Sequence, residues 1–290
     1  MLADNSYEFV GRPVSNNKKI DLYFVLGESA SSNQMSLYDY KRKITPYLDS
    51  LPQEFITKFN NVLSPSSSTF ASYEIMFSPS RVKNTKMFFI APNLIEELKH
   101  IGYQVVWQTY HSGRQSVIYE SLVRNADFHY SSDDNVDDRK MLVMLFKNLK
   151  EEASVYFINM YGSHPYFNVP EDQIYFSEKK SNDKKQDTIN RYDNTILALD
   201  NFIKRVVKMA EKHKKNTKRP YAIWYVSDHG LVLFKDGSNW AGHSLNSENI
   251  SGFQIPFFIL NKSNLPCGEK LDRVYGENTG STFEMVLVSL

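Results

Sequence analysis

Residues able to hold a metal stand directly after two apolar runs. Asp228 and His229 follow the apolar residues 222–226, and Glu28 follows the run 22–26 after a single glycine. Carboxylates and imidazoles are both zinc ligands. In open α/β sheets, ligands bind outside the carboxyl ends of the strands, so two strands that each end in a carboxylate indicate an α/β metal site. Either group alone would also suit an ordinary turn.

A serine-rich segment supplies a candidate nucleophile. Residues 64–68 read Ser-Pro-Ser-Ser-Ser and lead directly into a helical pattern over 69–77. A hydroxyl at a helix N-terminus meets free backbone N–H groups and the positive end of the helix dipole, which suit a phosphate ester. Thr69 is therefore a candidate for phosphoryl transfer. The alternative is that Ser68 or Thr69 only caps the helix.

Two histidines lie in loops near the same predicted strand ends. His164 follows a strand candidate that ends near Asn159, and His243 comes shortly after Asp228 and His229. Imidazoles in such loops can bind phosphate or metal. A loop histidine is more often simply exposed. Each of the two is therefore a candidate only because the other candidate residues are predicted to lie nearby.

Alternating strand and helix patterns must position these side chains. Short apolar runs rich in β-branched and aromatic residues predict strands at 21–26, 104–107, 154–159, 222–226 and 255–260. Helical patterns lie at about 45–60, 69–77, 92–100, 136–150 and 187–214. The alternation predicts an α/β fold, a mostly parallel central sheet with helices on both faces. Loops are expected at 64–68 and 177–186. Without an internal repeat or a domain boundary, residues 1–290 are expected to form one domain.

Composition narrows the class of protein. The 34 Lys and Arg residues nearly balance 33 Asp and Glu residues, for a net charge of +1, which gives no general attraction to nucleic acid. Cys267 is the only cysteine, so internal disulfides and cysteine-based zinc clusters are excluded. The sequence stops within the apolar periodic segment 283–290, and we expect a piece of a longer protein.

Taken in order, the motifs resemble the phosphoethanolamine transferases of the alkaline phosphatase and sulfatase superfamily, which modify bacterial surface glycans. The matching stretches extend over almost the whole chain, at 25–30, 36–40, 68–72, 76–78, 159–165, 191–197 with Asp200, and 226–230. The family's glycine between His164 and Pro165 is absent, and Leu231 replaces the usual glutamate. Pro65 stands where the disulfide-rich members have a cysteine, so the chain looks closer to the cysteine-poor members.

The resemblance implies an alkaline phosphatase/sulfatase-like catalytic domain with a zinc centre. Its four ligands would be Glu28, Asp228, His229 and the oxygen of Thr69, which would also be the nucleophile. The resemblance gives the remaining candidates a role in binding the substrate phosphate or a second metal: His164, His243 and Arg114. Arg114 stands close to the position at which members of the family have a lysine.

A two-step transfer follows from the same resemblance. Phosphatidylethanolamine would be the donor, Thr69 would carry the phosphoethanolamine covalently, and the acceptor would be lipid A, a lipopolysaccharide core sugar or another surface glycan. The expected location is the periplasmic face of the bacterial inner membrane. Association with that membrane would come from segments outside this chain.

Other functions remain as alternatives. A serine hydrolase elbow around Ser29 would need glycine where Ser31 stands. A type I sulfatase would need a nucleophile made from a cysteine in a setting that Cys267 lacks. A metal-dependent phosphatase or phosphodiesterase of the same superfamily is the main enzymatic alternative, with water replacing the sugar. An inactive glycan-binding domain would be expected to have lost ligands, whereas all four are present.

Overall fold

The computed structural model describes residues 8–109, 117–131, 137–177, 183–234, 241–243, 249–266, 282, 286 and 290. Within them, seven strands form one sheet in the order β2-β9-β6-β1-β5-β3-β4. The strands are β1 (Asp21–Gly27), β2 (Ile56–Phe59), β3 (Gln104–Thr109), β4 (Phe128–Ser131), β5 (Ser154–Asn159), β6 (Tyr221–Ser227) and β9 (Phe257–Leu260). The inner strands β6, β1, β5 and β3 run parallel, and β9 runs antiparallel to both of its neighbours.

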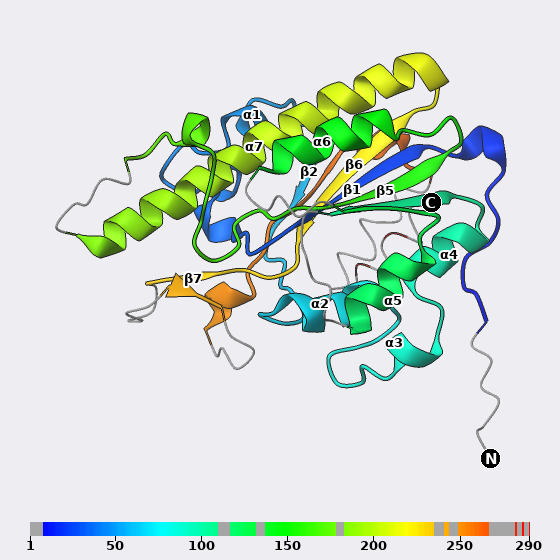
Figure 1. Cartoon of the computed structure of the whole chain (residues 1–290), viewed down its shortest axis with the longest axis horizontal. Helices are drawn as coiled ribbons and strands as arrows, with labels where there is room; N and C mark the ends of the chain where they lie inside the picture. The colour runs from blue at the N-terminus through cyan, green and yellow to red at the C-terminus, as the bar shows by residue number, and fades with distance from the viewer. Residues whose placement is uncertain are drawn as a thin grey trace.

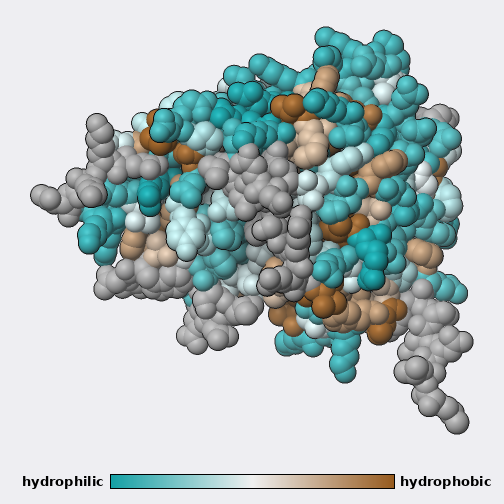
Figure 2. All heavy atoms as spheres, in the orientation of Figure 1, coloured by the Kyte–Doolittle hydropathy of each residue, from teal (hydrophilic) through white to brown (hydrophobic). Residues whose placement is uncertain are grey.

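Helices cover both faces of this sheet (Figure 1). On one face lie α1 (Pro46–Asp49), α6 (Asp138–Lys147) and α7 (Lys184–Thr217). On the other lie α2 (Thr69–Met76), α3 (Met87–Ile90), α4 (Leu94–His100) and α5 (Val117–Asn125). The predicted mostly parallel sheet with helices on both faces is thereby confirmed. The upper part of Figure 2, where α7 runs, is mostly hydrophilic on its outer side.

Strand β1 shows why the central strands appear as uninterrupted apolar runs. Leu22, Phe24 and Leu26 point into the core under α2, α4 and α5, whereas Tyr23 and Val25 point into the core under α6 and α7. Successive side chains of a strand face opposite sides, so a strand that is covered on both faces must be apolar at every position.

Most sequence predictions of single elements are confirmed with small changes at their ends. The strands expected at 21–26, 104–107, 154–159, 222–226 and 255–260 are β1, β3, β5, β6 and β9. The helices expected at 69–77, 92–100, 136–150 and 187–214 are α2, α4, α6 and α7. The loop at 64–68 is also confirmed. Of the loop expected at 177–186, residues 178–182 lie outside the described residues, and α7 begins at Lys184, earlier than expected.

The helix expected over 45–60 is wrong. Helix α1 covers only Pro46–Asp49, and the same segment ends in strand β2. Ile56 pairs with Leu260 of β9, so pairing with a distant strand overrides the local helical pattern. Helix α5 and strand β4 were not predicted at all.

Short elements complete the description. After β6, the strands β7 (Val232–Leu233) and β8 (Ala241–Gly242) pair antiparallel. Single 3₁₀ turns lie at Asn16–Lys18, Ser32–Gln34, Ser36–Tyr38, Glu171–Gln173, Ile250–Gly252 and Lys262–Asn264. None of the helices in the described part of the chain is long and apolar enough to span a membrane.

Candidate metal centre

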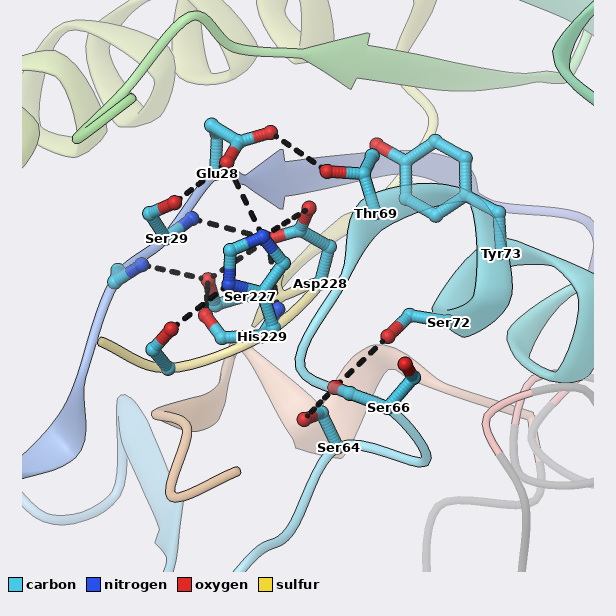
Figure 3. Close-up of polar contacts among 12 residues, drawn as sticks. Glu28, Ser29, Ser64, Ser66, Thr69, Ser72, Tyr73, Ser227, Asp228 and His229 are labelled. Atoms are coloured by element: carbon cyan, nitrogen blue, oxygen red, sulfur yellow. Dashed lines mark hydrogen bonds and ion pairs between the residues drawn. The ribbon is translucent and has the colours of Figure 1, made fainter. Parts of the chain in front are cut away.

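The two neighbouring strands β1 and β6 bring Glu28 and the Asp228–His229 pair to one point. Gly27 pairs with Ser227 in parallel register, and the Asp228 N–H donates to the Gly27 carbonyl at 3.1 Å. All three candidate ligands are buried, with exposed fractions of 0–2%. Figure 3 shows their side chains gathered at the carboxyl end of β1. The structure thus brings together the three residues that the sequence places at these two strand ends.

The imidazole of His229 faces both carboxylates. Its Nε2 lies 3.4 Å from Glu28 Oε1 and 3.6 Å from Asp228 Oδ2. Its Nδ1 lies 2.8 Å from the carbonyl oxygen of Gly230, a contact that suits an N–H donor at Nδ1. A backbone acceptor at one ring nitrogen orients the ring and leaves the other nitrogen for a metal. His229 is therefore arranged as a ligand through Nε2.

Thr69 is the first residue of α2, and its hydroxyl points at the same group. Thr69 Oγ1 donates to Glu28 Oε2 at 3.1 Å (Figure 3). Ser68 occupies the N-cap position, but its side chain makes no capping hydrogen bond. The geometry thus favours the nucleophile interpretation of this segment over simple capping, because the Thr69 hydroxyl is directed at the candidate metal ligands.

The turn after β1 fixes the two carboxylates. Ser29 has a left-handed backbone with φ of 55°, which turns its N–H towards Asp228 Oδ1 at 3.0 Å. Ser29 Oγ donates to Glu28 Oε1 at 2.6 Å. The His229 N–H also donates to Asp228 Oδ1, at 2.7 Å. Because two backbone N–H groups hold Oδ1, the other oxygen of Asp228 is turned towards His229 Nε2.

The two loop histidines differ in their relation to this centre. His243 directly follows β8, and its ring centroid lies 4.3 Å from that of His229. Ligand atoms of Glu28, His229 and His243 all lie within 4.8 Å of one another. His164 lies in the loop after β5, with its ring 5.1 Å from that of Tyr161, and its charge contributes to lowering the pKa of His243. The ligand-atom group does not include His164.

Arg114, the third candidate for binding the substrate phosphate, lies outside the described residues. The structure therefore neither places it at the centre nor removes it from there.

Burial and mutual charge shift the pKa values of these groups. Burial first, and then the charge of Glu28, raise the pKa of Asp228 to about 6. Burial alone would lower the pKa of His229, but the charges of Asp228 and Glu28 outweigh it and raise that pKa to about 9. Burial and the neighbouring His229 lower the pKa of His243. The centre as a whole thus has a negative potential that favours a bound cation.

The residues present fit the zinc ion that the family resemblance implies. Asp228 Oδ2, His229 Nε2 and His243 Nδ1 are buried and have no hydrogen-bond partner within the described part of the chain. Buried polar atoms are normally paired, and two buried carboxylates require compensating positive charge. Oxygen and nitrogen donors in this number are a typical zinc ligand set.

Two supporting residues were not singled out from the sequence. Ser227 Oγ accepts from the Ala30 N–H at 2.9 Å and donates to the His229 carbonyl at 3.0 Å, tying the two strand ends together. Gly162 has φ of 56°, and a Cβ there would lie 3.1 Å from the backbone N and O of Glu28. The available signals were the position of Ser227 directly before Asp228 and that of Gly162 just before His164.

The sequence has curated relatives along most of its length. Phosphoethanolamine transferase EptA of Helicobacter pylori is 28% identical over 272 residues, which cover 88% of this chain and 50% of the relative. The chain spans about half the length of the curated relatives it matches.

Solved structures share the fold. The C-terminal periplasmic domain of EptC from Escherichia coli, in complex with Zn, superposes with a TM-score of 0.75 at 23% identity, covering 89% of this chain and 78% of that one. The soluble domain of lipooligosaccharide phosphoethanolamine transferase A from Neisseria meningitidis gives a TM-score of 0.79 at 22% identity, covering 97% and 90%.

A family assignment follows from the match along the chain itself. The sequence model described as Sulfatase matches residues 21–276, which include both strand ends, Thr69 and both loop histidines. This chain belongs to the sulfatase family, with homologues named phosphoethanolamine transferases.

Proposed function

We propose that residues 1–290 form the catalytic domain of a zinc-dependent phosphoethanolamine transferase. The observation that carries the proposal is the hydrogen bond from Thr69 Oγ1 to Glu28 Oε2, because it places a hydroxyl at a helix N-terminus against a metal-ligand group. The names of the curated relatives and the zinc complex of the EptC domain support the same activity. The proposed donor is phosphatidylethanolamine, and the acceptor is a hydroxyl of a lipopolysaccharide or other surface glycan.

Four groups would hold the zinc: Glu28, Asp228, His229 and the Thr69 oxygen, with His243 within reach as a further ligand. When bound, zinc lowers the pKa of a hydroxyl and offsets the charge that develops on a phosphoryl group. Glu28 has a second function in this arrangement, since it already accepts the hydrogen bond of Thr69. Its carboxylate therefore orients the hydroxyl and lies in the path of the departing proton.

In the first step, the Thr69 oxygen attacks the phosphorus of the donor. The bond between phosphorus and the glycerol oxygen breaks, diacylglycerol leaves with a proton, and phosphoethanolamine stays on Thr69. Thr69 is the first residue of α2, and the positive end of a helix dipole favours the negative charge of the phosphoryl group.

In the second step, a sugar hydroxyl attacks the same phosphorus and the bond to the Thr69 oxygen breaks. The sugar hydroxyl loses its proton, and Thr69 regains one. His164 and His243 are the side chains proposed to hold the phosphoryl oxygens or to exchange these protons, because both lie in loops at the same end of the sheet. The periplasmic face of the bacterial inner membrane is the proposed location, because it gives access to the lipid donor.

Intact-mass spectrometry of the zinc-loaded chain after incubation with phosphatidylethanolamine tests the proposal. We expect an added phosphoethanolamine mass, mapped to the peptide that contains Thr69. Thr69→Ala should abolish the adduct, whereas Thr69→Ser should retain it, since the hydroxyl is kept. Ser72→Ala is the matched control, because Ser72 lies on the same helix and its Oγ donates to the Ser66 carbonyl instead of to the centre.

Two outcomes would contradict the proposal. An adduct that persists in Thr69→Ala would transfer the nucleophile role to another residue such as Ser29. Release of diacylglycerol and free phosphoethanolamine in the presence of a glycan acceptor, without transfer to it, would indicate the phosphodiesterase alternative. Zinc content must be confirmed by elemental analysis in each variant, so that a lost metal is not mistaken for a lost nucleophile.

A further inference from the structure

A cavity open to solvent lies at the same edge of the sheet as the candidate metal centre. It has a volume of about 290 Å³. At the volume of liquid water, this is space for roughly ten water molecules, enough for one sugar ring with its hydroxyls. Four of the side chains that line it are neutral amides: Asn33, Asn60, Asn61 and Gln254.

The cavity and the metal centre share one edge of the sheet. Strand β2 ends at Phe59, which pairs with the first residue of β9, so Asn60 and Asn61 lie at the edge where β1 and β6 also end. Two strand spacings separate β2 from β6, on the order of 10 Å. This is the crevice in which open α/β sheets bind their ligands.

The same chain segments line the cavity and build the centre. Asn33 follows Glu28 by one short turn, and the segment after Asn61 leads directly to Thr69. The backbone of Gln254 lies close to the turn after β6, since a Cβ at Gly230 would lie 2.7 Å from the Gln254 carbonyl oxygen. A ligand in the cavity would therefore contact chain segments that also carry residues of the centre.

Charge in the cavity argues for a neutral ligand. The two charged residues of the lining, Lys58 and Asp39, have opposite charges that cancel. The lining therefore has no net positive charge of the kind that a phosphate site needs. Lys58 is also engaged elsewhere, because its Nζ donates to the Leu37 carbonyl at 2.7 Å and lies over the Tyr38 ring.

The amides have the chemistry that hydroxyl groups require. Asn33 Nδ2 donates to Gln254 Oε1 at 2.5 Å, and this is the one side-chain hydrogen bond of either residue within the described part of the chain. The Asn33 oxygen and the Gln254 amide nitrogen therefore remain for a ligand as an acceptor and a donor. A sugar hydroxyl donates and accepts at once, so such pairs suit it.

We propose that the cavity lined by Asn33, Asn61 and Gln254 binds one neutral sugar ring of the acceptor glycan. The inference rests on the proposed function in naming that sugar as the acceptor, but binding in the cavity can be measured without any transfer. In the proposed transfer, the sugar ring would lie at the same sheet edge as Thr69, with a hydroxyl directed towards the metal centre.

Saturation-transfer NMR with the 290-residue chain and three probes, glucose, mannose and N-acetylglucosamine, tests the inference. At least one probe should bind with a millimolar Kd. That Kd should not change when sodium chloride is raised, because a neutral ligand is not screened. Inorganic phosphate at equal concentration should not displace the sugar.

Two variants remove amides in different ways. Asn61 is exposed and has φ of 58°, which glycine adopts freely, so Asn61→Gly removes the side chain without backbone strain. It should weaken binding about three- to tenfold, the loss of one hydrogen bond. Gln254→Leu should weaken it more than about tenfold, because an apolar group then faces the sugar. Asn201→Leu is the control, since this amide bonds to the Leu197 carbonyl within α7.

The outcomes separate the two proposals. A missing adduct in the native chain would reject the transferase mechanism but leave the sugar site to be judged by binding alone, because binding is measured without any transfer. Absence of binding by all three probes, displacement by phosphate, or an unchanged Kd in both amide variants would overturn the sugar site even if the Thr69 adduct forms.

Discussion

The hydroxyl of Tyr192, a residue of α7, holds the turn at Ser29 in place through two hydrogen bonds. It donates to the Ser29 carbonyl at 2.8 Å and accepts from the Ser31 N–H at 2.8 Å. Tyr192 is fully buried on α7, so the long helix and not the loop alone holds Ser29 in its left-handed conformation. The direction of Glu28 thus depends on a residue that would not contact the metal.

Tyr192→Phe should therefore weaken both the fold and the metal centre. Two buried backbone groups lose their partner, which costs on the order of 1–3 kcal/mol in free energy of unfolding. Loss of such outer support also lowers metal affinity by about tenfold or more. Urea unfolding and a zinc competition assay measure the two effects.

Tyr225→Phe is the matched control for this prediction. Tyr225 is also fully buried, but its hydroxyl has no hydrogen-bond partner within the described residues. Its replacement should leave the free energy of unfolding unchanged or raise it. Equal destabilisation by the two substitutions would show that the Tyr192 hydroxyl contributes nothing specific.

His243 and His164 should differ in their effect on zinc binding. Ligand atoms of His243, Glu28 and His229 lie within 4.8 Å of one another, and His164 is not in this group. His243→Ala should lower zinc affinity about ten- to a hundredfold. His164→Ala should change it less than about threefold, although it should still slow the transfer. Zinc competition with a chromophoric chelator, together with a transfer assay, gives both values. The opposite order of zinc affinities would exchange the two roles.

The sequence could predict which residues stand at the ends of β1 and β6, because fully buried strands appear as uninterrupted apolar runs. Strands β1 and β6 are covered on both faces and appear as apolar runs, so their ends could be located within about one residue. Glu28, Asp228 and His229 stand directly at those ends. Thr69 was predictable for a related reason, since a serine-rich loop runs into a helical pattern there.

What could not be predicted depends on contacts between distant segments. Strand β2 owes its conformation to pairing with β9 and not to its local pattern, which favours a helix. The nearness of His243 to His229 depends on the pairing of β7 with β8, two strands too short to give a period. Tyr192 lay within a motif that the resemblance matched, yet no spacing rule links it to Ser29.

Gly162→Ala should disturb Glu28 through its backbone. The left-handed conformation alone costs an added Cβ about 1–2 kcal/mol, and that atom would lie 3.1 Å from the Glu28 N and O. We expect lower stability together with weaker zinc binding. Gly102→Ala is the control, because φ there is 92° but the added Cβ would meet only the flexible end of Lys19. It should reduce stability without changing zinc affinity. Equal zinc affinity in the two variants would contradict the proposed coupling.

Asp200 should give the fold a measurable pH dependence. Its carboxylate accepts from the N–H groups of Tyr47 and Leu48 at 2.9 and 3.0 Å, at the start of α1. Burial raises its pKa to about 6, although these N–H groups oppose the rise. Between the ordinary value of 3.8 and about 6, the folded chain holds a proton on Asp200 that the unfolded chain has lost. This contribution to stability therefore falls as pH rises through that window.

Comparison with Asp200→Asn isolates this effect from the other carboxyl groups, which titrate alike in both proteins. The free energy of unfolding of the native chain minus that of the variant should be larger at pH 5 than at pH 7, by on the order of 1 kcal/mol. Urea unfolding at both pH values measures the difference. A gap that is equal at the two pH values, or larger at pH 7, would mean that Asp200 ionises in the folded chain at its ordinary pKa or below it.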